Sequence, residues 1–357
     1  MSTRRSFMQG AALAGIAGIV AARRAPAFAQ DTKIKKIGVL GLGSHSFAVR
    51  FKTRPEGYTK EILAKPYGVW DDNPQVADAM KGEVYEKVFR DPVQLAKECD
   101  CIHIEHADYR KVFELAQPGL EMGKPTFINR PFTATIADAE ETVRLAKAYK
   151  APLMSASSLE FGEEVPQMQA FMKEKGPIRA YEAYGPEGHF TWHLPHVINY
   201  AHAGLGGGID TVYFAGDFEI DLRQFRNEKK PTGDTLCVLT YKPRDGQPPI
   251  IGMCHVNNYP GQFHVNVYAV KENRNFILQG KWDMNMFDKL NDLYSFGKIP
   301  RPYEAILEQH RALVAANVSR LTGRAVKLDS LGGNDALPYT DGIRDYVVSR
   351  TLAPVKK

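Results

Sequence analysis

The sequence predicts an α/β protein with two domains, an N-terminal domain with a doubly wound parallel sheet and a C-terminal α+β domain with an open, mostly antiparallel sheet. Three observations carry this prediction. A glycine-rich turn follows the first apolar strand, strands and helices alternate up to about residue 156, and most later apolar segments have the pattern of strands. The chain of 357 residues is long enough for two such cores. We place the domains at 30–156 and 157–334, with a tail at 335–357.

The first strand leads into a turn of the kind that binds dinucleotides. The strand covers residues 36–40, and the sequence GLGSHS follows it directly. This is a G-x-G-x-x-G turn in which a serine replaces the third glycine. Its first two glycines permit the tight turn and the close approach of a pyrophosphate to backbone N–H groups. We therefore predict a Rossmann-type domain in which Gly41, Gly43 and Ser44 bind the cofactor.

An acidic residue at the end of the second strand supports this interpretation. The strand at 67–70 ends at Asp71. A carboxylate at this position can bind the hydroxyls of the adenosine ribose, which favours NAD over NADP.

The alternation continues along the first domain and then stops. Strands are expected at 100–104, 125–128 and 152–154, with helices at 109–121 and 136–147. In the second domain, strands are expected at 180–184, 235–240, 250–254 and 265–268, and a late helix at 303–321. The Asp245-Gly246 turn predicts an antiparallel hairpin, in which Cys237 and Cys254 would face each other. An exported protein could oxidise them to a disulfide, but folding in a reducing cytoplasm precedes export, so we expect two buried free thiols.

The first 29 residues predict export. Arg4 and Arg5 precede a soft apolar stretch at 11–22, and Ala27-Phe28-Ala29 fits a cleavage site. The arginine pair favours the twin-arginine route, so we expect the export machinery as a partner and a periplasmic or otherwise exported location. The stretch is too short and too rich in glycine for a membrane anchor.

The charge of the remaining chain excludes a nucleic-acid partner. Of 46 Lys plus Arg, four lie in the first 29 residues, which leaves 42 basic against 41 acidic residues. A nucleic-acid-binding protein needs a much larger basic excess.

Three motifs resemble one family over nearly all of the mature chain. They are the Gly-Leu-Gly turn, GKPTFINRP at 123–131 and His-Val-Ile-Asn at 196–199. With them, the chain resembles the glucose–fructose oxidoreductase/inositol dehydrogenase (Gfo/Idh/MocA) family. The resemblance implies a Rossmann domain, an open-sheet domain, and NAD(P)-dependent oxidation or reduction of a sugar, polyol or related hydroxy compound between them. Several exported members of the family carry twin-arginine signals.

The motifs depart from the family at the catalytic positions. Arg130 stands where the family has a lysine that contacts the reacting hydroxyl, and arginine is a poor proton shuttle. Trp192 and Asn199 replace two carboxylates around His196, and Ala107-Asp108 replaces a Thr-Pro pair. We expect His196 to move the proton, Arg130 to hold the reacting oxygen and Asn199 to orient the substrate. Histidine suits that role because it titrates near neutral pH. A buried structural His196 and an ion-paired Arg130 are the alternatives.

A second constellation suggests different chemistry. Glu105, His106, His193 and His196 could converge at the carboxyl edge of the sheet and bind a divalent metal. The protein would then be a hydrolase, lyase or epimerase on a carbohydrate-like ligand. Pro195 argues against a long regular helix around the two later histidines. A third alternative is a ligand-binding protein on the same fold. The open sheet leaves a face that needs cover, so we expect a homo-oligomer.

Overall fold

The structure of this protein is a computed structural model that describes residues 33–41, 47–82, 84–186, 190–216, 234–243, 248–257, 261–339, 342, 344 and 345. The predicted signal peptide at 1–29, the turn residues Gly43 and Ser44, and the Asp245-Gly246 turn lie outside these residues. Where the structure describes the chain, no helix is both long and apolar enough to cross a membrane.

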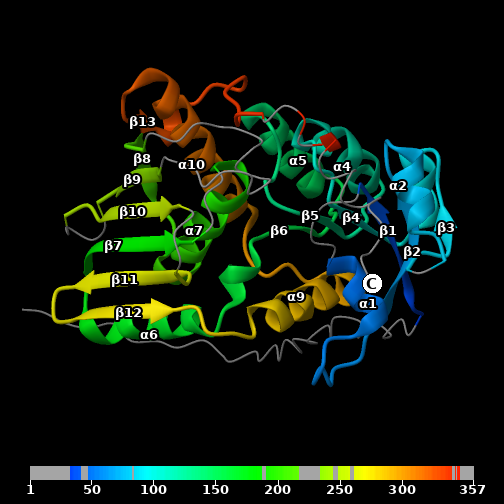
Figure 1. Ribbon diagram of the computed structural model, residues 1–357, viewed down its shortest axis with the longest axis horizontal. Helices are drawn as coiled ribbons and strands as arrows, with labels where there is room; N and C mark the ends of the chain where they lie inside the picture. Colours follow the sequence, from blue (N-terminus) through cyan, green and yellow to red (C-terminus); the bar gives the residue numbers. More distant parts are fainter. Residues whose placement is uncertain are drawn as a thin grey trace, which may run out of the picture. The chain divides into compact units, whose positions relative to one another are not determined.

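The described residues of the N-terminal domain form a six-stranded parallel sheet in the order β3-β2-β1-β4-β5-β6 (Figure 1). The strands are β1 Lys35–Leu40, β2 Ala64–Trp70, β3 Lys87–Val88, β4 Cys101–Ile104, β5 Thr126–Ile128 and β6 Leu153–Ser155. The order reverses between β1 and β4, as in a dinucleotide-binding Rossmann sheet. This confirms the predicted doubly wound domain and the alternation of its elements.

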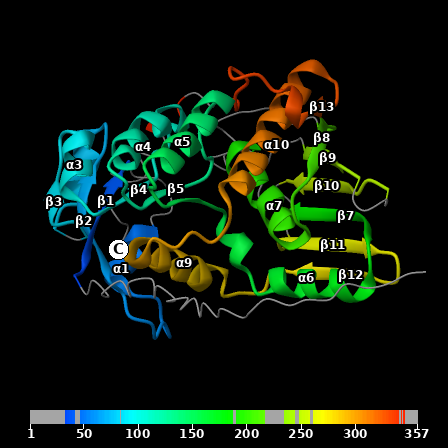
Figure 2. The ribbon, with the colours of Figure 1, turned by 180° about the vertical axis from the view of Figure 1, so that it is seen from behind.

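Helices cover both faces of this sheet, so its strands are apolar on both sides. One face packs against α3 Pro92–Glu98, α4 Val112–Glu121 and α5 Ile136–Ala148. The other face packs against α1 Arg50–Thr53 and against α9 Trp282–Phe296, which the sequence analysis did not predict (Figures 1 and 2). The rings of Phe51 and Phe287 meet there at 4.6 Å between centroids. Asn73 and Asp91 cap the starts of α2 Pro74–Ala79 and α3, each with a proline at the first helical position.

The second sheet has seven strands within the described residues, in the order β12-β11-β7-β10-β9-β8-β13. They are β7 Ile178–Gly185, β8 Ile209–Phe214, β9 Thr235–Tyr241, β10 Ile251–Val256, β11 His264–Ala269, β12 Asn273–Ile277 and β13 Val326–Lys327. All pairs are antiparallel except β7 with β10, which confirms the mostly antiparallel sheet. Cys237 and Cys254 are register partners across β9 and β10, as expected, and both are buried free thiols.

One face of this sheet packs against helices. They are α6 Glu164–Lys175, α7 Phe190–Leu205 and α10 Tyr303–Thr322. Short 3-10 helices complete the described elements: η1 Phe47–Val49, η2 Tyr109–Lys111, η3 Ser158–Phe161 and η4 Leu328–Ser330.

Pro195 argued against a long regular helix around His193 and His196. This expectation is wrong, because α7 is a helix of 16 residues that includes Pro195. A proline in the second turn removes only one backbone hydrogen bond, the one to the carbonyl of Thr191. Nearly every residue of α7 is buried, and this packing offsets the loss.

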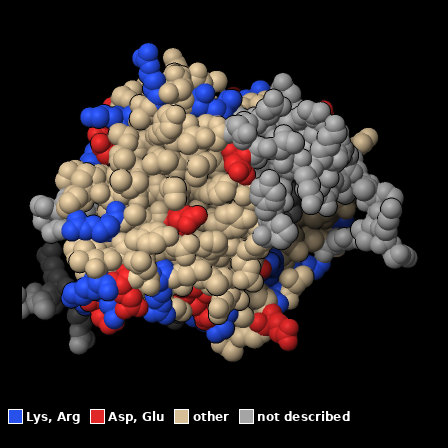
Figure 3. Space-filling model, turned by 60° about the vertical axis from the view of Figure 1, so that its left-hand side comes forward, with Lys and Arg blue, Asp and Glu red and all other residues tan. Residues whose placement is uncertain are grey.

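The opposite face of the second sheet carries several exposed apolar residues. Tyr213, Val238 and Met253 are register neighbours on β8, β9 and β10, and Ile251 and Tyr268 flank Ala180 of β7 in the next row. Of these, Tyr213, Ile251, Met253 and Tyr268 are exposed. Figure 3 shows the side of the molecule with β7–β12, where uncharged residues predominate.

The C-terminal tail returns to the N-terminal domain. The backbone N–H of Leu337 donates to the carbonyl of Ala134 at 2.9 Å, and the Tyr109 hydroxyl donates to the carbonyl of Pro338. Arg344 then ion-pairs with residues that follow β2.

Candidate active site

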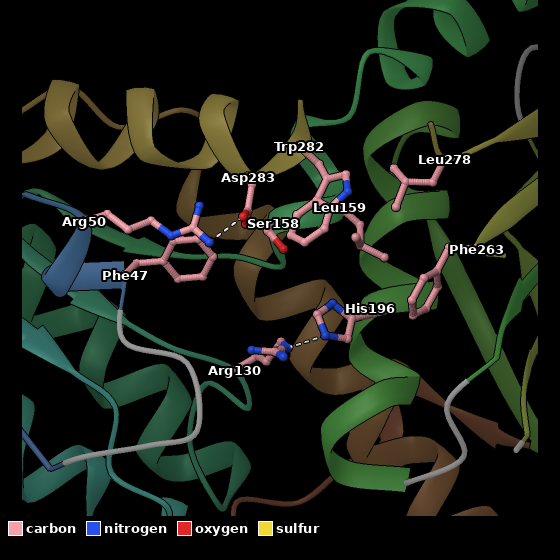
Figure 4. Close-up of a pocket in the computed structure, with 10 residues that line it drawn as sticks. All are labelled: Phe47, Arg50, Arg130, Ser158, Leu159, His196, Phe263, Leu278, Trp282 and Asp283. Carbon is pink, nitrogen blue, oxygen red and sulfur yellow. Dashed lines mark hydrogen bonds and ion pairs between the residues drawn. The ribbon is translucent and has the colours of Figure 1, made fainter. Parts of the chain in front are cut away.

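A cavity of about 350 Å³ lies at the carboxyl ends of the parallel strands (Figure 4). Phe47 and Arg50 follow the turn after β1, Arg130 follows β5, and Ser158 follows β6. The second part of the chain adds His196 of α7. The remaining lining residues are Leu159, Phe263, Leu278, Trp282 and Asp283. Ligands of doubly wound sheets bind at this edge, so the cavity is the candidate active site.

Arg130 and His196 meet in this cavity, although 66 residues separate them in the chain. The Nε–H of Arg130 donates to Nε2 of His196 at 2.8 Å, and its Nη1 donates to Oδ1 of Asn129 at 3.0 Å. A guanidinium nitrogen has no lone pair to accept with, so Nε2 must be the acceptor. His196 is therefore a neutral imidazole with its hydrogen on Nδ1.

A serine that the sequence analysis did not single out fixes this tautomer. Nδ1 of His196 lies 2.6 Å from Oγ of Ser157, which is fully buried behind the imidazole. Because Nδ1 carries the hydrogen, Ser157 accepts it. Ser157 also starts η3, where its side chain and that of Glu160 form a capping box. The S-x-x-E pattern of a capping box is the sequence feature that could have revealed this pair.

Glu160 is the centre of a buried network behind the cavity. Its carboxylate pairs with the guanidinium of Arg301 and accepts from Nδ2 of Asn199 at 2.9 Å and from Nε2 of Gln309 at 3.3 Å. Burial lowers the pKa of Arg301 to about 9, which leaves it charged at neutral pH. Asn199, predicted to orient the substrate, thus uses its amide on Glu160 and is not among the residues that line the cavity.

The rest of the cavity wall is mainly apolar. Phe47, Phe263 and Trp282 supply aromatic surface, and two leucines complete the wall. Figure 4 shows the ion pair between Arg50 and Asp283 on the side of α1 and α9, apart from the Arg130–His196 pair. The cavity therefore has a pair of polar side chains at each of two separate places, and most of the remaining lining is apolar.

The predicted metal ligands do not come together. Oε1 of Glu105 lies 2.5 Å from Nε2 of His103 and accepts from the backbone N–H of Phe47 at 3.1 Å. His106 instead approaches Asp72, 3.1 Å from Nε2 to Oδ2. Among the residues that the structure describes, no group of three or more His, Cys, Asp or Glu side chains could hold a metal ion.

The edge of the Rossmann sheet where we predict that the dinucleotide binds carries a glycine after β1, Gly41, and a carboxylate after β2, Asp71. Gly41 has a φ of 78°, and a Cβ there would lie 2.5 Å from Cα of His106, so only glycine fits. Asp71 directly follows β2, and its buried carboxylate accepts from the backbone N–H of Asn73 at 2.9 Å. A carboxylate at this place fits an adenosine ribose.

The tail arginine lies on that acidic edge. Arg344 ion-pairs with both Asp71 and Asp72. Burial alone would raise the pKa of the Asp72 carboxyl, but hydrogen bonds from His106 and Lys111 and the charge of Arg344 hold it well below its usual range. The guanidinium thus lies against the carboxylate that is expected to bind the ribose.

The fold and the site define a dinucleotide-binding Rossmann domain joined to a mixed-sheet domain, with a cavity at the carboxyl edge of the Rossmann sheet. Residues 35–157 match the Gfo/Idh/MocA family model, described as an oxidoreductase family with an NAD-binding Rossmann fold. This match over the N-terminal domain confirms the resemblance to the family that the motifs predicted.

Solved structures show the same fold along most of the chain. A probable dehydrogenase from Thermotoga maritima is 17% identical, with a TM-score of 0.65, and the match covers 83% of this chain and 100% of that one. The scyllo-inositol dehydrogenase of Lactobacillus casei with bound NAD(H) and scyllo-inositol is 16% identical, with a TM-score of 0.66 and coverage of 84% and 100%. The myo-inositol dehydrogenase of the same organism with NAD(H) and myo-inositol is 14% identical, with a TM-score of 0.68 and coverage of 84% and 98%. No curated protein matches the chain.

Proposed function

We propose that this protein is an exported NAD-dependent oxidoreductase that acts on a sugar, polyol or related hydroxy compound. The observation that carries the proposal is the Arg130–His196 pair, which borders a cavity at the carboxyl edge of an NAD-binding Rossmann sheet. The similar inositol dehydrogenases, with NAD(H) and an inositol bound, support a carbohydrate-like substrate.

In this proposal Gly41, Gly43, Ser44 and Asp71 hold the dinucleotide, and the carboxylate of Asp71 favours NAD over NADP. The nicotinamide supplies a hydride acceptor or donor when it is bound. Arg344 has to leave Asp71 for the ribose to bind there, because one carboxylate face cannot serve both partners.

Arg130 and His196 then have different roles at the substrate oxygen. Arg130 stays protonated, so it binds and polarises that oxygen but does not take its proton. When Arg130 turns from His196 to the substrate, Nε2 of His196 is released and can accept the hydroxyl proton. Ser157 keeps the hydrogen of Nδ1 in place during this step and orients the ring. Asn199 contributes indirectly, through Glu160.

Native mass spectrometry of the folded protein, compared with its denatured mass, tests the central claim. Calorimetry with NAD(H) should follow for any protein that is isolated without cofactor. Release or binding of a dinucleotide would support the proposal and justify a screen of hydroxy compounds for cofactor reduction. Failure to bind NAD(H) or NADP(H) would contradict it.

Export by the twin-arginine route rests on Arg4, Arg5 and the apolar stretch behind them. Cell fractionation with antibody detection tests it. Replacing both arginines with lysine should retain the protein in the cytoplasm, whereas an unchanged distribution would contradict this route.

Self-association is part of the same proposal. The exposed apolar rows on β8, β10 and β11 are the surface that a second copy would cover. Sedimentation measures the mass in solution, and Met253→Lys should shift it toward the monomer. A wild-type monomer would contradict this part.

A further inference from the structure

A small internal cavity adjoins the candidate active site. Its volume is about 20 Å³, and Arg130 lines both cavities. Much of its lining is apolar, with side chains such as Phe132 and Leu313, and Asn199 of α7 and His310 of α10 line it as well. The last four residues are buried. A cavity needs roughly 10–15 Å³ to hold one water molecule, so this one has room for a single water and for little else.

Asn199 brings a hydrogen-bond acceptor without a donor to this small cavity. Its Nδ2 donates to Oε1 of Glu160 at 2.9 Å. This bond fixes the orientation of the amide, because the reverse orientation would place the amide oxygen against a carboxylate. Oδ1 of Asn199 is the remaining polar atom. It is buried and has no hydrogen-bond partner among the residues that the structure describes. A buried amide oxygen needs such a partner, since its loss of hydration is otherwise not compensated.

His310 brings a second acceptor. Its Nε2 lies 3.2 Å from the carbonyl oxygen of Thr135, which can only accept, so Nε2 carries the ring hydrogen. Burial lowers the pKa of His310 to about 4, so the imidazole is neutral at neutral pH. Nδ1 therefore has a free lone pair. This atom is also buried, and within the described part of the chain nothing donates to it.

Two acceptors cannot bond to each other, so Oδ1 of Asn199 and Nδ1 of His310 need a donor that reaches both. A water molecule has two O–H groups and the right size. A cation would be costly to bury here unless a carboxylate paired with it. The described residues that line the small cavity include no carboxylate. Both the volume and the hydrogen-bonding groups thus fit water.

We propose that the small cavity binds one water molecule, which donates one O–H to Oδ1 of Asn199 and the other to Nδ1 of His310. The water links α7 to α10 and holds the amide of Asn199 in the orientation that donates to Glu160. This is a structural role for Asn199. The inference does not depend on the proposed function, because no atom of a substrate or cofactor takes part in it.

A high-resolution crystal structure of the full chain tests the site directly. We expect one isolated peak of electron density at about 2.7–3.2 Å from both Oδ1 of Asn199 and Nδ1 of His310. Ordered side chains with no peak between them would overturn the inference. A peak that contacts only one of the two atoms would overturn it as well, and so would a peak that refines as an ion.

Two variants of His310 test the same site in solution. His310→Gln can keep the bond to the carbonyl of Thr135 but loses the acceptor at Nδ1, whereas the shorter amide of His310→Asn can place an acceptor near that position. Relaxation dispersion of oxygen-17 counts the long-lived internal waters, and thermal unfolding shows whether each variant is folded. We expect His310→Gln to lose one long-lived water and His310→Asn to retain it. An unchanged count in a folded His310→Gln would overturn the inference. If that variant does not fold, the crystal structure of the unaltered chain decides.

Discussion

Two clusters of side chains in this protein are centred on an arginine, one on Arg301 in the interior and one on Arg130 at the cavity. They differ in the partners of the arginine and in its access to a ligand. Arg301 pairs with the buried carboxylate of Glu160, which also accepts from the backbone of Ser157 and from the side chains of Asn199 and Gln309. Arg130 donates to the imidazole of His196 and to the amide oxygen of Asn129, and it borders the cavity. A guanidinium paired with a carboxylate in the interior stabilises the fold, whereas one that borders a cavity can contact a ligand.

Ser157 joins the two clusters. Its backbone N–H donates to Glu160 at 2.6 Å, and its hydroxyl accepts from His196. The buried cluster therefore orients the cavity cluster. Substitutions in the first should affect the free energy of unfolding, and substitutions in the second should affect turnover.

The largest expected effect is the loss of the buried ion pair. Arg301→Ala leaves the carboxylate of Glu160 buried without its charged partner, which should cost about 3–5 kcal/mol in unfolding free energy. Urea unfolding monitored by circular dichroism measures it. The matched control is Arg311→Ala, which breaks an exposed pair with Glu140 and should cost below about 1 kcal/mol. Equal losses of unfolding free energy would show that the buried Arg301–Glu160 pair stabilises the fold no more than the exposed Arg311–Glu140 pair.

Removal of the imidazole tests the cavity cluster. His196→Ala should lower kcat/KM by roughly 10²–10⁴-fold, because it removes the proposed proton acceptor. His193→Ala, one turn away and outside the cavity lining, is the matched control and should retain most of the activity. Steady-state kinetics with the substrate found in the screen provides the comparison. A similar loss in both variants would assign the effect to the packing of α7 and not to proton transfer.

The pH dependence of stability tests a buried histidine, His310, that lies behind the cavity. Burial lowers the pKa of His310 to about 4, whereas an unfolded histidine titrates near 6.5. Between these values the unfolded chain binds more protons, so the stabilising contribution is complete above about pH 6.5 and decreases as the pH falls toward 4. Unfolding free energy should drop by about 2 kcal/mol from pH 7 to pH 5. His310→Gln should flatten this slope, and a slope unchanged in that variant would assign it to other groups.

The smallest expected effect concerns Arg344, a half-buried arginine at the edge where we propose that the dinucleotide binds. If Arg344 competes with the ribose for Asp71, Arg344→Ala should strengthen NAD(H) binding about fivefold, equivalent to ~1 kcal/mol. Calorimetry measures the affinity, and Arg324→Ala, on an exposed turn outside this edge, is the control. Weaker binding in Arg344→Ala would show instead that the tail arginine belongs to the cofactor site.

The fold was largely predictable because its signals are local. Alternating apolar segments and the Gly41 turn identified the Rossmann domain, and the spacing of Cys237 and Cys254 about a turn identified a hairpin in the correct register. Helix α9 was not predicted, and neither was its position on the Rossmann sheet. Its apolar face packs on strands more than 100 residues earlier, and a local pattern does not identify so distant a partner.

The candidate site was predictable only in part, for the same reason. Residue type identified Arg130 and His196, since few side chains polarise an oxygen or exchange a proton near neutral pH. Only the folded chain places them 2.8 Å apart, directs Asn199 to Glu160, and brings Arg344 onto Asp71. The sequence by itself determined which chemical groups this protein has and which elements carry them. The tertiary structure decided which groups meet, because hydrogen bonds and ion pairs depend on distances between segments that lie far apart in the chain.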